Sequence, residues 1–386
     1  MTEVTLTGLP TGWCRAVERL VTRRGRLRPV RLFSVAALVE HPALGGVLVD
    51  TGYAPRVLAA SRRWPYRLYR WATPMTAPPA LAAVAQTAYR TERVAAVVLT
   101  HLHADHVGGV LDFSGARLLA PRRAWPDRRL RGLAAVRRAV LPDLLPPSLD
   151  ARVELFDPAD GTVGNANSEA PRQDVDSRLR GNDGTGVESE DRPASVGGHA
   201  VVITDKRADG IADDRVAGCA DGSLAGGPAS CGHAVPFAQR GGQASDQRGA
   251  SQGERASSTL AHGHADGLSA RPVDCGALGQ GVDLFGDSSM VAVDLPGHAR
   301  GQIGVIVRDR YRGLALLAAD ALWDRRALAG GPPSRLTHGI ADDAAAQART
   351  VDRVWAWRRA TGGAVLPSHD LGAWQAWDAA LTAAVR

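Results

Sequence analysis

The sequence has few of the features that mark several large classes of protein. It contains no run of 18 or more apolar residues, which argues against a membrane-spanning helix. Its four cysteines form no Cys-x-x-Cys pair, so the sequence predicts neither a zinc ribbon nor a disulfide framework. The first residues lack the basic and then apolar pattern of a secretory signal, and we therefore expect a cytoplasmic protein.

Lysine is nearly absent, since Lys206 is the one lysine among 46 basic residues. The net charge of +6 is unevenly spread, because residues 1–160 are basic and residues 161–289 are acidic. The arginine-rich stretch from Arg122 to Arg138 is typical of a solvated helix face, and a charge run alone is a weak sign of nucleic-acid binding. We therefore expect a small-molecule substrate, with no nucleic-acid partner and no membrane partner, and we leave the oligomeric state open.

Large aromatic residues are missing from residues 161–281, which contain no Trp or Tyr and a single Phe, Phe237. The stretch is rich in Gly, Ser, Asp and Ala. A segment with so few large apolar side chains cannot offset the entropy lost on ordering. The sequence therefore predicts one domain, residues 1–386, with a mostly disordered insertion at residues 161–281. Its scattered histidines are not expected to bind metal.

Apolar runs mark the elements on both sides of this insertion. The predicted strands are residues 30–39, 46–49, 95–99, 118–120, 290–293, 304–307, 314–318 and 364–366. The predicted helices are residues 81–89, 128–140 and 341–359. In both halves strands come first and then alternate with helices, which predicts an α/β sandwich with helices outside two sheets. Removing the insertion joins residues 153–157 to residues 282–285, which predicts a short hairpin there.

The run His101-Leu-His103-Ala-Asp105-His106 directly follows the predicted strand 95–99. Imidazole and carboxylate groups are preferred ligands of zinc and similar divalent metals. His101 and His103 are two residues apart and can point the same way from an extended segment. Asp105 and His106 follow as the chain turns and can face a second metal. Clustered histidines without a metal are unfavourable to bury, because protonated imidazoles repel one another.

Three further residues of the types that bind metals follow strands in the second half of the chain. His298 lies in a turn after the strand 290–293, Asp320 ends the run 314–320, and His369 follows the strand 364–366. Ligands gather at the C-terminal ends of strands in layered α/β proteins. The sequence therefore predicts that these residues join the histidine cluster in one metal centre.

These motifs, in this order, resemble those of the metallo-β-lactamase superfamily over residues 30–160 and 282–375. The resemblance implies a four-layer αββα sandwich with two divalent metal ions, Zn²⁺ first, with Fe or Mn as alternatives. It implies that His101, His103 and His298 hold one metal, that Asp105, His106 and His369 hold the other, and that Asp320 bridges them. It also implies that Asp50 supports a ligand histidine. Without the insertion, the number of residues between His106 and His298 falls to a value that is usual in this family.

The resemblance implies a dinuclear hydrolase in which a metal-bridging hydroxide attacks the carbonyl of a small ester, lactone or thioester. Asp105 or Asp320 would pass the proton to the leaving group. The motifs resemble most the N-acyl homoserine lactonase branch, although Trp323 stands where that branch typically has Tyr. Trp323 and His338 are candidate substrate-binding residues. The aromatics of residues 62–71 either hold an acyl chain or pack their helix onto the sheet.

Two alternative functions share this fold. A glyoxalase-II-like thioesterase has the same histidine motif but carries an added C-terminal helical domain, and few residues follow His369. A phosphodiesterase or nuclease of this fold usually has Gly where Ala104 stands. A secreted antibiotic β-lactamase is disfavoured for two reasons. Enzymes of one subclass have Cys near this position, where the present chain has Asp320 and no Cys, and the sequence shows no secretory signal.

Overall fold

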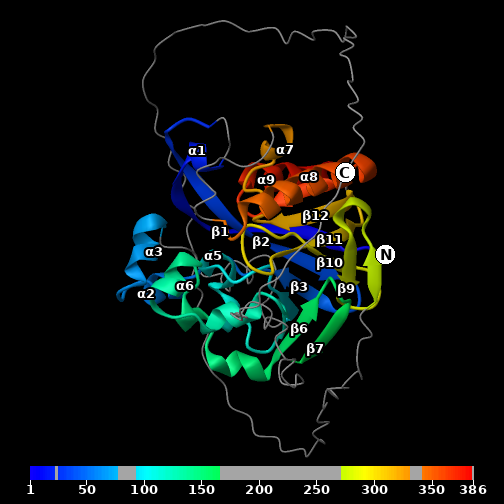
Figure 1. Ribbon diagram of the computed structural model, residues 1–386. Coiled ribbons are helices and arrows are strands. Elements are labelled where there is room, and N and C mark those ends of the chain that lie inside the picture. Colours follow the sequence, from blue (N-terminus) through cyan, green and yellow to red (C-terminus); the bar gives the residue numbers. More distant parts are fainter. Residues whose placement is uncertain (22–24, 77–92, 166–270, 331–340, 385–386) are drawn as a thin grey trace, which may run out of the picture. The chain divides into compact units, whose positions relative to one another are not determined.

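The computed structural model describes residues 1–21, 25–76, 93–165, 271–330 and 341–384, and in this part of the chain two mixed β-sheets pack face to face (Figure 1). The first sheet has the order β1 (Thr5–Val17), β2 (Pro29–His41), β3 (Gly45–Val49), β4 (Val94–Val98), β5 (Arg117–Pro121), β6 (Val153–Asp157) and β7 (Thr162–Asn165). The second has the order β13 (Ala364–Pro367), β12 (Gly313–Ala319), β11 (Ile303–Asp309), β10 (Met290–Asp294), β9 (Gln280–Asp283) and β8 (Pro272–Asp274).

The main core lies between the two sheets, and strand alternation explains how it forms. Val47 and Val49 of β3 face the second sheet, whereas Leu48 between them faces the helices outside. Strand β11 repeats the pattern, with Val305 facing the first sheet and Ile306 facing outward. Because both faces of these strands are covered, their sequences are continuous apolar runs rather than alternating ones.

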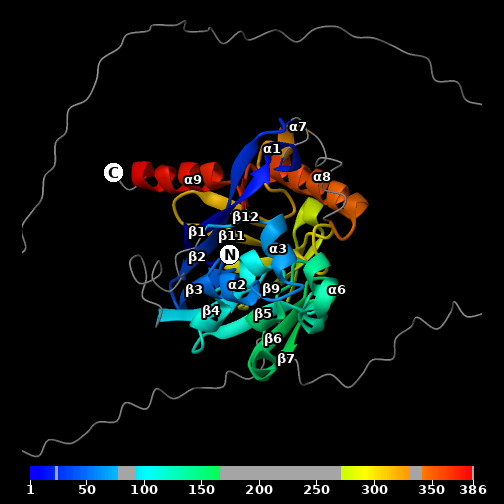
Figure 2. The same ribbon diagram turned by 90° about the vertical axis from the view of Figure 1, so that its left-hand side faces the viewer.

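Helices cover the outer faces of both sheets (Figures 1 and 2). Those beside the first sheet are α2 (Pro55–Ala60), α3 (Arg67–Ala72) and α6 (Gly132–Arg137). The second sheet is covered by α7 (Ala327–Gly330) and α8 (Ala344–Thr361), and α9 (Leu371–Ala384) runs beside β1 and β13. The order helix, sheet, sheet, helix is the predicted four-layer αββα sandwich.

All eight predicted strands are present, but several elements were not predicted. Strands β1, β7, β8 and β9 and helices α2 and α9 are additional. The predicted helix 128–140 is wrong in its bounds, because residues 125–129 form a 3₁₀ turn and the α-helix covers only Gly132–Arg137. The predicted helix 341–359 corresponds to α8, and the predicted helix 81–89 lies outside the described residues. None of the described helices is long and apolar enough to cross a membrane.

The predicted bounds of the insertion, residues 161–281, are wrong at both ends. Residues 162–165 form β7, which pairs with β6, and residues 272–274 and 280–283 form the β8–β9 hairpin. The predicted hairpin between residues 153–157 and 282–285 is also wrong, because these strands belong to different sheets. Residues 166–270 of the predicted insertion lie outside the described residues.

We expect that residues 166–270 can be replaced by a flexible linker of about eight residues without loss of the fold. Pro272 lies 3.5 Å from the position of a Cβ at Gly161. Asn165 is four residues further on and these residues span at most about 14 Å, so with the separation between Gly161 and Pro272 the gap is at most about 20 Å, which such a linker can span. Circular dichroism, thermal melting and metal content measure the outcome. An unfolded or metal-free product would show that the replaced segment is needed.

Candidate metal centre

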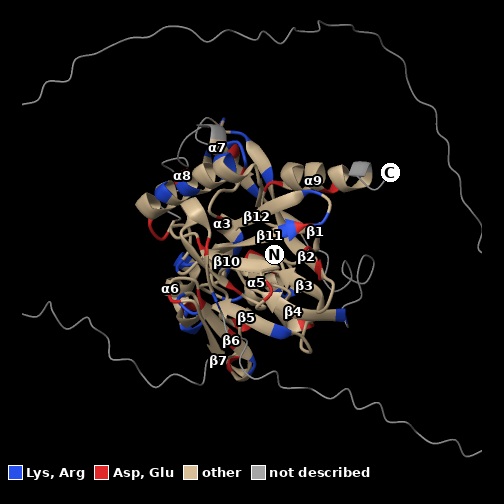
Figure 3. Ribbon diagram, turned by 90° about the vertical axis from the view of Figure 1, so that its right-hand side faces the viewer, with Lys and Arg blue, Asp and Glu red and all other residues tan. Residues whose placement is uncertain are grey.

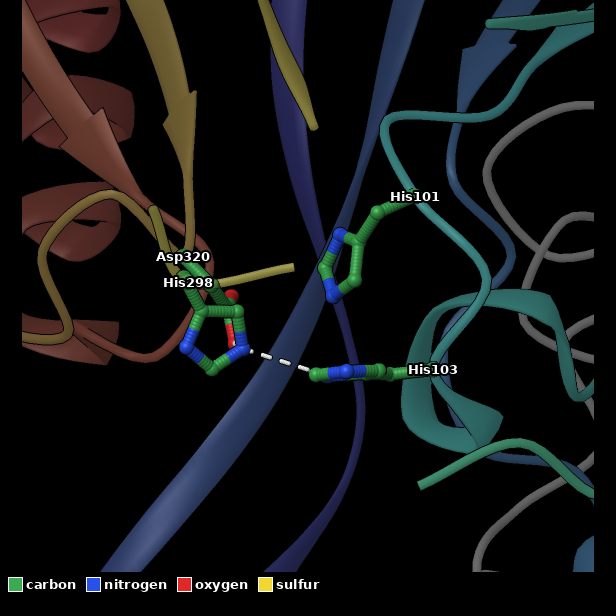
Figure 4. Close-up of side chains that lie close together, drawn as sticks. All are labelled: His101, His103, His298 and Asp320. Atoms are coloured by element: carbon green, nitrogen blue, oxygen red, sulfur yellow. Dashed lines mark hydrogen bonds and ion pairs between the residues drawn. The ribbon is translucent and has the colours of Figure 1, made fainter. Parts of the chain in front are cut away.

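The seven predicted ligands meet at the C-terminal ends of strands from both sheets. His101 and His103 follow β4, and Asp105 and His106 lie in the short helix α5 (Ala104–Val107). The ligands from the second sheet follow β10, β12 and β13 and are His298, Asp320 and His369. Figure 4 shows His101 and His103 reaching the centre from one side and His298 and Asp320 from the other. The two halves of the chain therefore supply one site together.

The ligand atoms form two groups. In each group the offered atoms lie within 4.8 Å of one another, and the groups are His101, His103, His298, Asp320 and Asp105, His106, His369. The carboxylate of Asp320 also reaches the second group. Its Oδ1 is 3.2 Å from Nε2 of His106, and its Oδ2 is 3.0 Å from Nε2 of His369. The same Oδ2 is 3.2 Å from Nε2 of His298, so Asp320 lies between the two groups.

Hydrogen bonds from outside the centre fix the orientation of three of the imidazoles. Nδ1 of His106 contacts Oδ2 of Asp50 at 2.8 Å, and Nδ1 of His369 contacts the carbonyl oxygen of Phe33. The hydroxyl of Thr100 donates to Asp50 at 2.7 Å and lies 3.0 Å from Nδ1 of His101. In each ring Nε2 is left for the centre, which is how metal-ligating histidines are usually held.

The backbone is strained at two positions beside the site. Asp50 has φ of 59° and Ala319, which precedes Asp320, has φ of 47°. Non-glycine residues rarely adopt such values, and the strain persists only where the surrounding structure imposes it. At Asp50 the contacts that hold this backbone conformation are the hydrogen bonds that its carboxylate accepts from Thr100 and His106.

Burial and neighbouring charges set the protonation of the ligands. Burial, followed by the nearby imidazoles, lowers the pKa of both His101 and His103 well below the usual value. Burial alone would raise the pKa of Asp320, but His369 and His106 outweigh it and hold that pKa well below its usual range. The centre therefore favours neutral imidazoles at His101 and His103 and an ionised carboxylate at Asp320, the forms that bind metals.

The residues present fit divalent metal ions. Nε2 of His101 is buried without a hydrogen-bond partner, and Nε2 of His106 and Oδ1 of Asp320 are buried 3.2 Å apart without forming a hydrogen bond. Leaving a buried polar atom without a hydrogen bond costs about 1–3 kcal/mol, which favours a further partner at this site. Nitrogen and carboxylate oxygen donors suit Zn²⁺, Fe and Mn.

Trp323 lies directly against this centre. Its indole N–H donates to Oδ2 of Asp320 at 3.1 Å. Its ring stands edge-on to His298 and His369, with centroids 5.7 and 6.1 Å away. Its predicted substrate-binding role remains a prediction, and the other candidate, His338, lies outside the described residues.

A cavity of about 510 Å³ opens beside the centre, with His103 and His298 in its wall. Arg137, the last residue of helix α6, and Arg138, which follows it, lie in the same wall. The sequence alone did not reveal these residues as part of a cavity, because the run from Arg122 to Arg138 predicted only a solvated helix face. The signal was present in its arginines, but which of them faces the cavity depends on how α6 packs.

Two groups of histidine and carboxylate side chains at the strand ends of an αββα sandwich form a candidate centre for divalent metal ions. A family model described as the metallo-beta-lactamase superfamily matches residues 30–212, which are 183 of the 386 residues. No curated protein matches the sequence.

Among solved structures the chain is similar to a variant of AiiA from B. thuringiensis with N-decanoyl-L-homoserine bound at the active site, at 12% identity, with 97% of each chain covered and a TM-score of 0.54. It is similar to an N-acyl homoserine lactone hydrolase with the product N-hexanoyl-L-homoserine bound at the catalytic metal center, at 12% identity, with 97% of each chain covered and a TM-score of 0.53. At these identities the likeness shows the fold alone.

Replacing Asp50 by Asn is expected to weaken metal binding by about 10- to 100-fold, the range seen when the partner of a ligand histidine is lost. The amide cannot accept all the hydrogen bonds that the carboxylate receives from Thr100 and His106. Competition titration against a chelator measures the affinity. Asp287→Asn is the control, because Asp287 pairs with the buried His41 at 2.7 Å outside the centre. Equal affinities in the two variants would contradict this role of Asp50.

Proposed function

We propose that this protein hydrolyses a small ester, lactone or thioester at a centre of two divalent metal ions. The observation that carries the proposal is the position of Asp320, whose two oxygens lie within 3.2 Å of His106, His298 and His369. A carboxylate shared by two groups of ligands is suited to bridge two cations. Support also comes from the fold, which is shared with structures whose names describe N-acyl homoserine lactone hydrolases.

One ion would be held by His101, His103 and His298 and the other by Asp105, His106 and His369, with Asp320 between them. When bound, such ions polarise a carbonyl oxygen and lower the pKa of water toward about 7. Zn²⁺ is the ion we propose, because imidazole nitrogen predominates among the donors.

The carboxylates of Asp105 and Asp320 differ in their exposure and in their contacts. Oδ2 of Asp320 accepts from Trp323 and lies 3.0 Å from His369, and its side chain is 3% exposed. The side chain of Asp105 is 15% exposed, and its nearest ionic contact, to Nε2 of His369, is 3.7 Å long. We therefore assign the transfer of a proton to the leaving oxygen or sulfur to Asp105. Asp320 is assigned to holding the centre together, oriented by the indole N–H.

The cavity fits a small acyl compound. Its volume of about 510 Å³ lies within the usual range of small-molecule sites. Its wall is mostly polar and includes Arg137, Arg300 and Asp127, with Leu102 and Val140 as apolar neighbours. Charged side chains beside a smaller apolar part suit a substrate that has both a polar part and a short acyl part.

The test uses the full purified chain. Metal content is measured after reconstitution with Zn²⁺, and hydrolysis is measured for lactones, esters, thioesters and a phosphodiester, before and after chelation. We expect about two metal ions per chain and activity on carbonyl substrates that chelation abolishes and Zn²⁺ restores. Fewer than one metal ion per chain, or hydrolysis that survives chelation, would refute the proposal. Cleavage of the phosphodiester alone would replace it with the phosphodiesterase alternative.

A further inference from the structure

Two tryptophans near helix α3 lie on the surface. Trp64 is 61% exposed and Trp71 is 66% exposed, so neither packs onto the sheet. The tyrosines of the same stretch do anchor it. Tyr69 is 4% exposed in the core, and the hydroxyl of Tyr66 accepts from the backbone N–H of Gly132 at 3.2 Å. The exposed indoles are therefore not explained by the packing of α3.

An arginine stands between these two tryptophans. The guanidinium carbon of Arg67 lies 5.3 Å from the ring centroid of Trp64 and 5.5 Å from that of Trp71, which are cation–π distances. Arg62, Arg63 and Arg70 are exposed around this trio. Residues 62–71 contain four arginines and no Asp or Glu, so the stretch carries charge of one sign.

Helix α6 adjoins this stretch through the bond between Gly132 and Tyr66, and Figure 2 shows α3 and α6 on the same side of the molecule. Leu133, at the start of α6, is 61% exposed. Helix α6 ends on one basic residue, Arg137, and Figure 3 shows both basic and acidic residues around this helix. We call the exposed side chains of residues 62–71 together with Leu133 the Trp–Arg surface.

We propose that the Trp–Arg surface binds peripherally to lipid bilayers that carry negative charge. Indole rings favour the interface between lipid and water. Each Arg near an anionic bilayer contributes about 1 kcal/mol of attraction, and the stretch has no acidic residue to cancel it. The charge of one sign favours a continuous anionic surface over a protein partner, whose interface would need its own acidic patch. The proposal revises the expectation that no membrane partner exists.

Membrane binding at this place would bear on how substrate reaches the cavity. Helix α6, which adjoins the Trp–Arg surface, also supplies Ala134 and Arg137 to the wall of the cavity beside His103. A bilayer docked there would lie next to that helix. The proposal itself does not depend on hydrolysis, because binding to lipid can be measured without a substrate.

The experiment is co-sedimentation of the full chain with vesicles of phosphatidylcholine alone and of phosphatidylcholine mixed with phosphatidylglycerol. We expect binding to the mixed vesicles that weakens with salt and falls about tenfold or more in a Trp64→Ser, Trp71→Ser double variant. Trp355→Ser is the matched control, because Trp355 is also exposed and has Arg359 over its ring at 4.5 Å. That variant should bind as the unaltered chain does.

Several results would overturn the proposal. One is absence of binding to the mixed vesicles, and another is equal binding by the double variant. A third is tryptophan-dependent self-association in light scattering without lipid binding, which would make this surface an interface between copies of the chain. Melting temperature and metal content should be unchanged in the double variant, because both side chains are mostly exposed. Loss of either would mean that the tryptophans stabilise the fold instead.

Discussion

Replacing Asp320 by Asn is expected to lower kcat/KM by about three orders of magnitude, the scale seen when a single group that stabilises charge is removed from an active site. The substitution keeps the size of the side chain but removes its negative charge. The carboxylate is within 3.2 Å of three buried imidazole nitrogens, and a neutral amide is a poor bridge between two cations. We therefore expect the loss of at least one metal ion as well as the loss of activity.

Elemental analysis and steady-state kinetics on the same preparation measure both effects of Asp320→Asn. Asp378→Asn is the control, because Asp378 lies on α9, is 37% exposed and accepts from the backbone of Gly8. The control should keep both metal ions and its activity. Full activity and unchanged metal content in Asp320→Asn would remove the basis for a bridged centre.

The second large effect is expected from Gly297→Ala. Gly297 has φ of 128°, and a Cβ there would lie 2.1 Å from the backbone nitrogen of Gln347. The carbonyl of Gly297 also accepts from the backbone N–H of Asp343 at 2.8 Å, so this turn holds the first turn of α8. Neither backbone can yield without loss of packing. We expect a loss of about 3 kcal/mol in the free energy of unfolding and weaker metal binding through the adjacent His298.

Gly313→Ala separates the steric effect from the backbone effect. Gly313 has φ of 77°, but no atom lies within 4 Å of a Cβ placed there. Its substitution should cost only about 1 kcal/mol, from the left-handed backbone alone. Denaturant unfolding of both variants gives the two free energies. Equal losses in the two variants would show that the close contact with Gln347 is relieved at little cost.

The sequence was most informative where apolar runs are long and covered on both faces. Strand β4 was predicted because residues 95–99 are continuously apolar, and all residues of β4 except Ala95 are buried in the structure. Strand β1 was missed because Gly8, Pro10 and Gly12 interrupt its pattern, and the structure accommodates them with an irregular register between Pro10 and Gly12. Strands β8 and β9 were missed because they are short and polar and are defined by pairing rather than by composition.

The candidate metal centre could also be predicted only in part from the sequence. The residue types and their places after strands were visible in the sequence, and the structure brings all seven together. The position of Asp320 among three histidines was not visible, because it depends on how two sheets pack. Nor did the sequence distinguish the buried Tyr69 from the exposed Trp71, since the packing of α3 decides between them.

The origin of the ligands in both sheets has a consequence for stability. All seven could contact the proposed pair of ions only while the sheets are packed together, so metal binding and folding would form one linked equilibrium. A ligand that binds the folded state alone stabilises it by about 2.7 kcal/mol at a hundred times its Kd. The heat resistance of this protein should therefore follow the supply of free metal in its surroundings.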